Sequence, residues 1–283
     1  MLAVALSLIA ALSWGSADFL GGLAARRRAL LAVMVLSQAS GLVALVVFTL
    51  PFAGSVPSLG ELVPAMVAGV VGVIALSLLY LALAIGRMSV VAPIAALGAV
   101  VPVLASLASG DALSAVIALG IVLALGGAAA SAASAPEPAA ERDGRRRRSI
   151  WLAVGAAAGL GAGLVLFDAA ADSGALWAVL VARTCAVTVV LAALTVRPVP
   201  LGLRDPGLGQ VALVGVLDAA ALALFSLASN EGLLAVVSVL ASLYPVVTVI
   251  LARVVLGERM RGVQIAGVAV AFLGIGLIAA GSS

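Results

Sequence analysis

Long, nearly continuous runs of apolar residues make up most of the chain, and short polar or charged segments separate them. A helix that crosses the ~30 Å hydrocarbon core of a bilayer needs about 20 mostly apolar residues. The runs are continuous rather than alternating in polarity, which favours helices over the short alternating strands of a membrane β-barrel. The pattern therefore predicts an all-α integral membrane protein with ten transmembrane helices, at 2–23, 30–52, 62–85, 89–108, 112–133, 150–168, 174–196, 208–228, 233–256 and 263–280.

The composition supports a membrane protein and excludes several other classes. Of the 283 residues, 65% are hydrophobic and 10% are charged, whereas a soluble domain has about 25% charged residues. The sequence has no histidine and one cysteine, Cys185, so histidine-based catalysis, histidine metal ligands and an intrachain disulfide are excluded. It also has no phosphate-binding P-loop motif. We expect no enzymatic activity, no cofactor and no metal, and we expect the lipid bilayer rather than nucleic acid as a partner.

One charged segment divides the chain almost in half. Residues 134–149 hold eight of the 27 charges, together with two prolines. The segment is expected to be a cytoplasmic linker between residues 1–133 and residues 150–283, each of which contains five of the predicted helices.

The two halves share an ordered set of features near their ends. Pro102 is followed by Gly110-Asp111 in the first half, and Pro245 is followed by Gly257-Glu258 in the second. Five is an odd number, so two successive five-helix repeats must have opposite orientations in the membrane. Inverted repeats of this kind are a recurrent architecture of secondary transporters. The sequence therefore predicts two inverted five-helix repeats.

The arginines indicate the orientation in the membrane. The loops after the odd-numbered predicted helices carry thirteen arginines, and the loops on the other side carry none. Because cytoplasmic loops are enriched in positive charge, we expect the arginine-bearing side to be cytoplasmic and both termini to lie outside. The expected location is the inner (plasma) membrane, with multiple passes. The thirteen are Arg26, Arg27, Arg28, Arg87, Arg142, Arg145, Arg146, Arg147, Arg148, Arg197, Arg204, Arg259 and Arg261.

Two opposite charges fall near the middle of predicted helices. Arg183 lies about ten residues into the seventh, and Asp218 about eleven residues into the eighth. A charge at this depth costs several kcal/mol unless it is compensated, so we expect the two side chains to pair or to share a polar cavity. The pair is a candidate substrate or coupling-ion site, or alternatively a structural salt bridge that fixes helix packing. If Asp218 carries a coupled proton, burial and Arg183 must set its proton affinity.

Five further polar or aromatic residues are candidates for binding a substrate or a coupling ion. Trp14 and Asp18 lie in the first predicted helix, where the alternative is an interfacial aromatic residue and a partly hydrated carboxylate. Gln38 lies in the second, where its amide can bond either a ligand or a neighbouring helix. Tyr80 and Tyr244 each combine an apolar ring with a hydroxyl group, which suits the lining of a pocket.

Three prolines and one turn are candidate helix breaks. A proline inside a helix removes a backbone hydrogen bond, and such breaks in membrane helices are tolerated in protein interiors or beside cavities. Pro93, Pro102 and Pro245 are expected to break or kink their helices, either to expose carbonyl groups to a cavity or only to improve packing. Gly257 and Glu258 are expected to form the turn before the last helix.

Several short motifs together resemble one family. The segment 242–252 followed by Leu256-Gly257-Glu258-Arg259, the early Trp14-Gly15-Ser16, and residues 86–93 resemble EamA-type permeases of the drug/metabolite transporter (DMT) superfamily. The resemblance covers the whole chain and implies ten helices in two five-helix repeats. Two departures are Gly110-Asp111, where the family often has Gly-Glu-Arg, and the charge-based orientation, because many members are described with cytoplasmic termini.

The resemblance implies a secondary transporter of small organic metabolites, commonly an exporter. Alternating access around a central site between the two repeats would then move the solute. The alternative is a structural or sensory membrane protein that transports nothing. The expected partners are lipid and a small-molecule substrate. Coupling to a proton and the choice between a monomer and a homodimer are left open.

Overall fold

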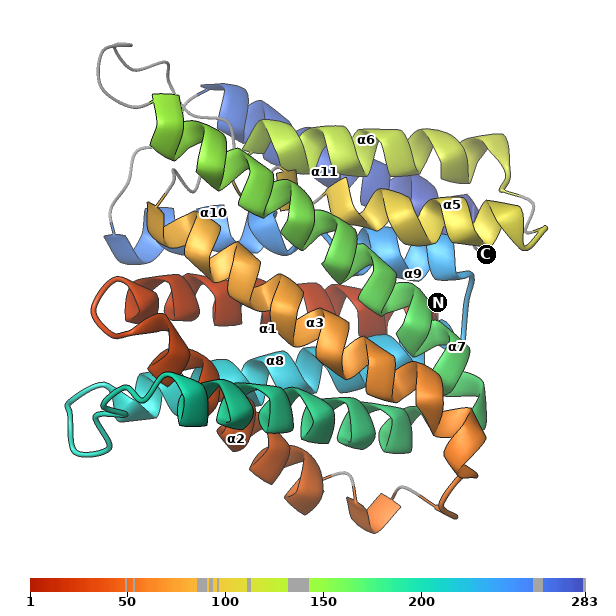
Figure 1. The fold of residues 1–283 in the computed structure, drawn as a ribbon. Helices are drawn as coiled ribbons and strands as arrows, with labels where there is room; N and C mark the ends of the chain where they lie inside the picture. The colour runs from red at the N-terminus through yellow and green to blue at the C-terminus, as the bar shows by residue number, and fades with distance from the viewer. Residues whose placement is uncertain are drawn as a thin grey trace.

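The computed structural model is entirely helical in the part of the chain that it describes (Figure 1). The described residues are 1–48, 50–52, 54–85, 91, 94–95, 97–110, 113–131, 143–256 and 262–281. The elements are α1 (Leu2–Ala25), α2 (Leu30–Phe48), η1 (Leu50–Phe52), α3 (Leu59–Ile85), η2 (Leu97–Ala99), α5 (Val100–Ala108), α6 (Ala115–Ser131), α7 (Asp143–Val196), α8 (Leu208–Ser229), α9 (Leu234–Ala241), α10 (Tyr244–Leu256) and α11 (Gly262–Gly281).

The predicted all-α membrane architecture is confirmed. Six helical segments are long and apolar enough to cross a bilayer, and four shorter apolar segments accompany them within the described residues. Together they account for the ten predicted transmembrane helices. The shorter segments are Leu97–Ala108, Ala115–Gly127, Leu234–Thr248 and Ile265–Ile278.

Glycine makes the connection between the sixth and seventh predicted helices unusually short. They form one continuous element, α7, with a sharp kink at Gly174, where φ is 146° and ψ is 90°. Residues with a side chain rarely adopt this backbone conformation, so the kink depends on glycine. The chain reverses direction there without a loop.

The ninth predicted helix, at 233–256, is interrupted in the structure. The helical assignment stops after Ala241 and resumes at Tyr244. Pro245 explains the interruption, because it has no N–H group to bond the carbonyl of Ala241 and its ring would collide with that carbonyl in a continuous helix. Pro102, by contrast, lies in the first turn of α5, where the missing N–H group has no helical partner to lose.

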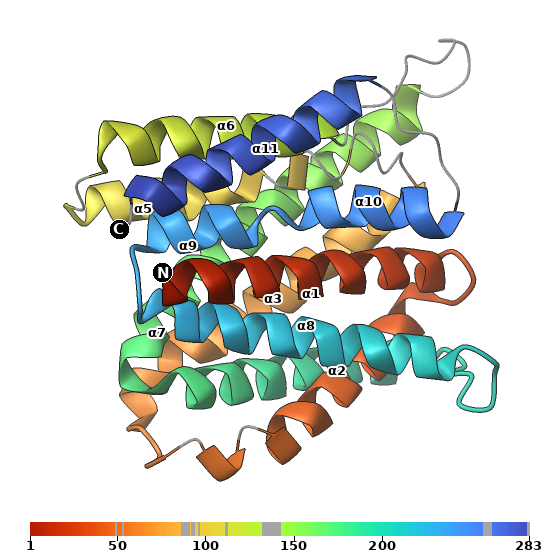
Figure 2. The same ribbon diagram turned by 180° about the vertical axis from the view of Figure 1, so that it is seen from behind.

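The helices pack as pairs that join the two halves of the chain. α3 lies along α7, α1 along α8, and α6 along α11 (Figures 1 and 2). Glycines permit close approaches of this kind. A Cβ atom on Gly69 of α3 would collide with the carbonyl oxygen of Ala182 in α7, and one on Gly215 of α8 would collide with that of Ser37 in α2, which also packs on α8. Small residues allow the same kind of backbone contact in other membrane helix pairs.

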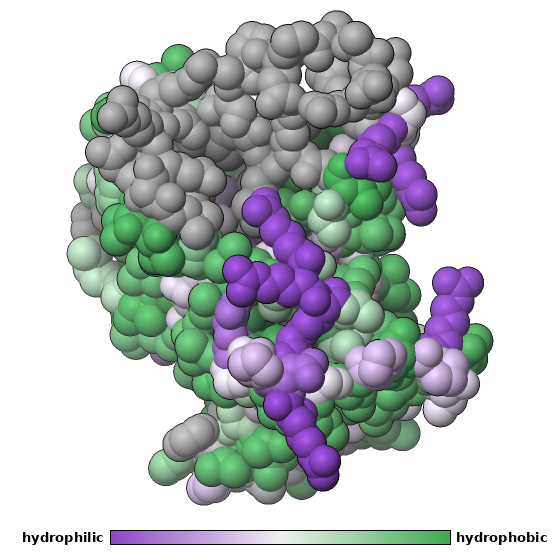
Figure 3. Space-filling model, turned by 90° about the vertical axis from the view of Figure 1, so that its left-hand side faces the viewer, coloured by the Kyte–Doolittle hydropathy of each residue, from purple (hydrophilic) through white to green (hydrophobic). Residues whose placement is uncertain are grey.

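Most of the described arginines lie at one end of the helical body. The turn between α1 and α2, the start of α7 and the connection from α7 to α8 all lie at this end (Figure 1). Figure 3 looks onto this end and shows hydrophilic side chains clustered on a largely hydrophobic surface. The N-terminus and the end of α11 lie at the opposite end (Figure 1). The described arginines of these turns are Arg26, Arg27, Arg28, Arg145, Arg147, Arg148, Arg197 and Arg204.

Candidate functional site

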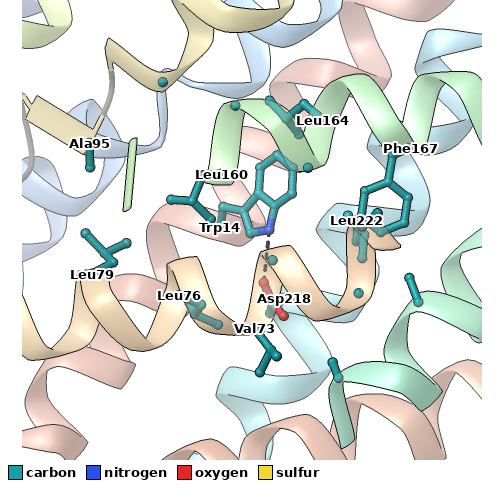
Figure 4. Close-up of a pocket in the computed structure, with 18 of the residues that line it drawn as sticks. Trp14, Val73, Leu76, Leu79, Ala95, Leu160, Leu164, Phe167, Asp218 and Leu222 are labelled. Carbon is teal, nitrogen blue, oxygen red and sulfur yellow. Dashed lines mark hydrogen bonds between the residues drawn. The ribbon is translucent and has the colours of Figure 1, made fainter. Parts of the chain in front are cut away.

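A cavity of about 130 Å³ lies between the two halves of the chain. One water molecule needs about 10–15 Å³ on the same scale, so the cavity has room for about ten waters or a small organic molecule. The first half contributes α1, α2 and α3 to its lining, and the second half contributes α7, α8 and the start of α10. Most of the lining is apolar, as Figure 4 shows for several of these side chains, among them Val73, Leu76, Leu160, Leu164, Phe167 and Leu222.

A buried ion pair forms the polar part of this cavity. Arg183 of α7 donates from Nη2 to the Asp218 carboxylate of α8 at 2.7 Å, and from Nη1 to the amide oxygen of Gln38 in α2. The Arg183 side chain is only 3% exposed, while that of Asp218 is 19% exposed. The predicted pairing of Arg183 with Asp218 is therefore confirmed. Gln38, which is 3% exposed, contacts a neighbouring helix through Arg183.

Trp14 of α1 extends this network across to the first helix. Its indole Nε1 donates to the second carboxylate oxygen of Asp218 at 3.1 Å (Figure 4). Its ring also lies near Phe225, with ring centroids 6.0 Å apart. Both oxygens of Asp218 are thus occupied, one by a cation and the other by a neutral donor. The carboxylate is fixed by groups from two other helices.

Asp18 lies one helical turn beyond Trp14 on α1 and also lines the cavity. Among the described residues, none donates a hydrogen bond to its carboxylate or forms an ion pair with it. The sequence left open whether Asp18 faces a site or a wet interface, and the structure places it on the cavity.

Tyr244 and Ser242 line the cavity at the interruption between α9 and α10. Thr248, one turn further along, donates to the carbonyl oxygen of Gly15 at 3.1 Å. A Cβ atom on Gly15 would also collide with the carbonyl oxygen of Tyr244. The start of α10 therefore lies directly against α1, so Tyr244 and the α1 side chains border the same space.

The remaining candidates lie elsewhere. Tyr80 is 1% exposed and packs in an apolar cluster beside Gly21, outside the cavity. Pro102 and Pro245 are buried but do not line the cavity themselves. Pro93, Gly257 and Glu258 fall outside the described residues.

Sequence reasoning overlooked the contribution of small residues to the cavity. Gly72 of α3 and Gly163 of α7 line it, and a Cβ atom on either would meet no heavy atom within 4 Å. Ser242 was also missed. The glycines of the sixth predicted helix recur at 155, 159 and 163, and this spacing was the one sequence signal that could have identified Gly163.

Comparisons with known proteins match this chain to a family of membrane transporters. The sequence profile of the EamA-like transporter family matches residues 147–280. The match covers a little under half of the chain and supports the expected resemblance to EamA-type permeases. A curated relative from Streptantibioticus cattleyicolor, named a probable terminal-alkyne amino-acid exporter, is 38% identical over 96 residues. That match spans about a third of the relative, namely 32% of its length and 32% of this chain.

The fold of this chain also occurs in a solved structure. One crystal structure, titled "Crystal structure of protein", aligns with 99% of this chain, and the alignment covers 98% of the chain in that structure. The TM-score is 0.78 and the sequence identity is 18%. At this level of identity the likeness shows the fold alone. The solved structure therefore supports the fold over nearly the whole chain. The family model supports the resemblance to EamA-like transporters over the second half only.

Proposed function

We propose that the chain is a secondary transporter that exports small organic metabolites across the plasma membrane. The observation that carries the proposal is the cavity, which both halves enclose and which holds the Arg183–Asp218 pair. A buried charge pair is costly to maintain in a membrane, and its position on a solute-sized space fits a binding site. The family match supports a transporter, and the exporter name of the relative supports export as the direction of transport.

The proposed mechanism is alternating access between two inverted repeats, residues 1–133 and 150–283. The packing of the helices supports it, because α1 lies along α8 much as α3 lies along the first part of α7. In each pair, the first helix of one repeat (α1, or the first part of α7) packs on the third helix of the other repeat (α8, or α3). The two pairs are therefore equivalent under the proposed repeat. Movement of one repeat against the other would then expose the cavity to each side in turn.

The apolar part of the cavity lining indicates the kind of solute. Aliphatic and aromatic side chains suit an apolar group on the substrate, and the charged cluster suits a polar one. A small amphipathic metabolite, such as an amino acid with an apolar side chain, satisfies both. Trp14, Asp18, Gln38, Arg183 and Tyr244 are the proposed contacts, with Asp218 as the counterion that holds Arg183.

Filling the cavity tests this proposal without removing any charge. In Gly163→Leu and Gly72→Leu the new Cβ atom would meet no heavy atom within 4 Å, so the larger side chain starts in open space beside the cavity. Leucine is also a better helix former than glycine. We expect both variants to fold and to lose at least about 90% of solute counterflow in reconstituted vesicles, measured with a labelled panel of amino acids, amines and organic acids. Gly60→Leu is the matched control, since its surroundings in α3 are also open but it does not line the cavity.

The outcomes separate clearly. Loss of counterflow in the two cavity variants, with Gly60→Leu unaffected, supports the cavity as the transport site. If the unmodified chain moves no solute on the panel under any ion gradient, a structural or sensory protein is the better reading. If the cavity variants transport as well as the unmodified chain, the site lies elsewhere.

We also propose that the arginine-rich end faces the cytoplasm and that both termini lie outside. The proposal follows from the enrichment of positive charge in cytoplasmic loops. A reporter enzyme that is active only outside the cytoplasm, fused after Ser283, should be active, while the same reporter inserted after Arg204 should be silent. The opposite pattern would reverse the orientation.

A further inference from the structure

The charges on the cavity do not balance. Among the described residues that line it, the ionisable groups are Asp18, Asp218 and Arg183, apart from the phenol of Tyr244. Arg183 already has Asp218 as its counterion at 2.7 Å. With both carboxyl groups ionised, the formal sum is one negative charge, and it belongs to Asp18. A charge that has lost much of its hydration is stabilised most by an opposite charge placed directly against it.

The cavity also presents buried donors that have no acceptor. The Nε of Arg183 and the hydroxyl of Tyr244 are both buried and lack a hydrogen-bond partner within the described structure. Most buried polar groups in proteins are paired, so an unpaired one calls for an explanation. Both residues line the cavity, and a bound solute with an acceptor oxygen would satisfy at least one of them.

We propose that Asp18 binds a protonated amine of the transported solute, while the unpaired donors of Arg183 and Tyr244 bind a neutral acceptor such as a carbonyl oxygen. The inference deepens the proposed function and rests on it. It names the substrate class as primary amines with an apolar body and an adjacent acceptor. It also assigns distinct roles to the two acidic residues: Asp218 holds Arg183 in place, and Asp18 confers selectivity for the amine.

Four related probes separate the amine from the rest of the molecule. Leucinamide has the amine, an apolar side chain and a neutral carbonyl; leucine adds a carboxylate; N-acetylleucinamide lacks the charge; and N-acetylleucine has only a negative charge. Binding of each to the full chain in lipid nanodiscs is measured by titration calorimetry at neutral pH. We expect leucinamide to bind tightest, leucine next, and the two acetylated probes at least about 10-fold more weakly than leucinamide, since a hydrogen bond to a charged group contributes about that much.

Removing the proposed amine contact should abolish this ranking. Asp18→Asn keeps the shape of the side chain, and we expect it to weaken leucinamide binding by about 10- to 100-fold while changing N-acetylleucinamide binding by less than about threefold. Glu231→Gln is the control for loss of one negative charge, because Glu231 lies in the exposed turn before α9 and does not line the cavity. It should bind all four probes like the unmodified chain.

The unmodified chain alone can overturn the inference, so the test does not depend on whether Asp18→Asn folds. If N-acetylleucinamide or N-acetylleucine binds as tightly as leucinamide, or if none of the four probes binds, Asp18 is not an amine site. If vesicles nevertheless move other solutes from the panel, the proposed transport function stands and only the substrate class is wrong. If nothing is transported, both proposals fail together.

Discussion

Neutralising Asp218 should destabilise the whole protein, because it leaves Arg183 without its counterion. Asp218→Asn preserves the size of the side chain and still offers an oxygen to Trp14. It removes the negative charge that lies 2.7 Å from a guanidinium with only 3% exposure. Breaking a buried pair in this way costs about 3–5 kcal/mol. We expect the lower end, about 3 kcal/mol, because the Asp218 side chain keeps 19% exposure and Asp18 lines the same cavity.

Arg183→Gln should cost a similar amount by leaving Asp218 uncompensated. The double variant, Arg183→Gln with Asp218→Asn, removes both charges, so its loss should fall short of the sum of the single losses by about 2–3 kcal/mol. Exchanging the two charges is expected to be less well tolerated than the double neutral variant. Trp14 donates its N–H to position 218, and an arginine there would place donor against donor.

Thermal unfolding of the purified chain in a mild detergent measures these effects. A loss of 1 kcal/mol lowers the melting temperature by roughly 2 °C for a chain of this size, so each single variant should melt about 6 °C lower. Glu231→Gln, an exposed change of the same kind, should melt like the unmodified chain. Single variants that melt within about 1 °C of it, or a double variant whose loss equals the sum, would refute the argument that the pair is energetically coupled.

Two further predictions concern helix packing and the arginine-rich end. Gly215→Ala places a methyl group against the carbonyl of Ser37, and this overpacking should cost roughly 1–3 kcal/mol and lower the melting temperature by several degrees. Gly209→Ala lies in open space on the same helix and should leave the melting temperature unchanged. Equal melting temperatures for the two variants would contradict the close contact. Arg28 donates to two carbonyl oxygens of the α7–α8 connection and so anchors it. Arg28→Ala should therefore speed tryptic cleavage of this connection several-fold. Arg26→Ala, at an exposed position, is the control, and an equal cleavage rate in the two variants would argue against the anchoring role.

The ten helices and the Arg183–Asp218 pair could be predicted because each follows from a local or pairwise cost. A spanning helix satisfies its own backbone hydrogen bonds, so its length and composition identify it. Two opposite charges near the middle of predicted helices stabilise each other more than any uncharged side chain of the sequence could. The interruption before Tyr244 was foreseen as a proline effect, but the ninth helix was drawn as continuous, since proline position alone does not show whether a membrane helix bends or stops.

The outcome for individual candidates was decided by packing. Tyr80 and Tyr244 have the same side chain and both lie in apolar helices, yet Tyr80 is enclosed beside Gly21 while Tyr244 borders the cavity. Asp18 could have faced a wet interface or a site, and periodicity did not distinguish them. Contacts between distant helices made the difference, such as the approach of α10 to α1 at Gly15.

The sequence by itself determined that the protein is a helical membrane protein, how many apolar helical segments it has, and which turns carry the arginines. These properties depend on transfer from water to lipid, which is nearly additive along the chain. Only the tertiary structure decided which helices touch, where they leave a cavity, and that Asp18, alone among the described acidic residues on the cavity, lacks a partner. Those properties depend on how closely backbones approach at a few small residues, and a sequence pattern carries no direct measure of that distance.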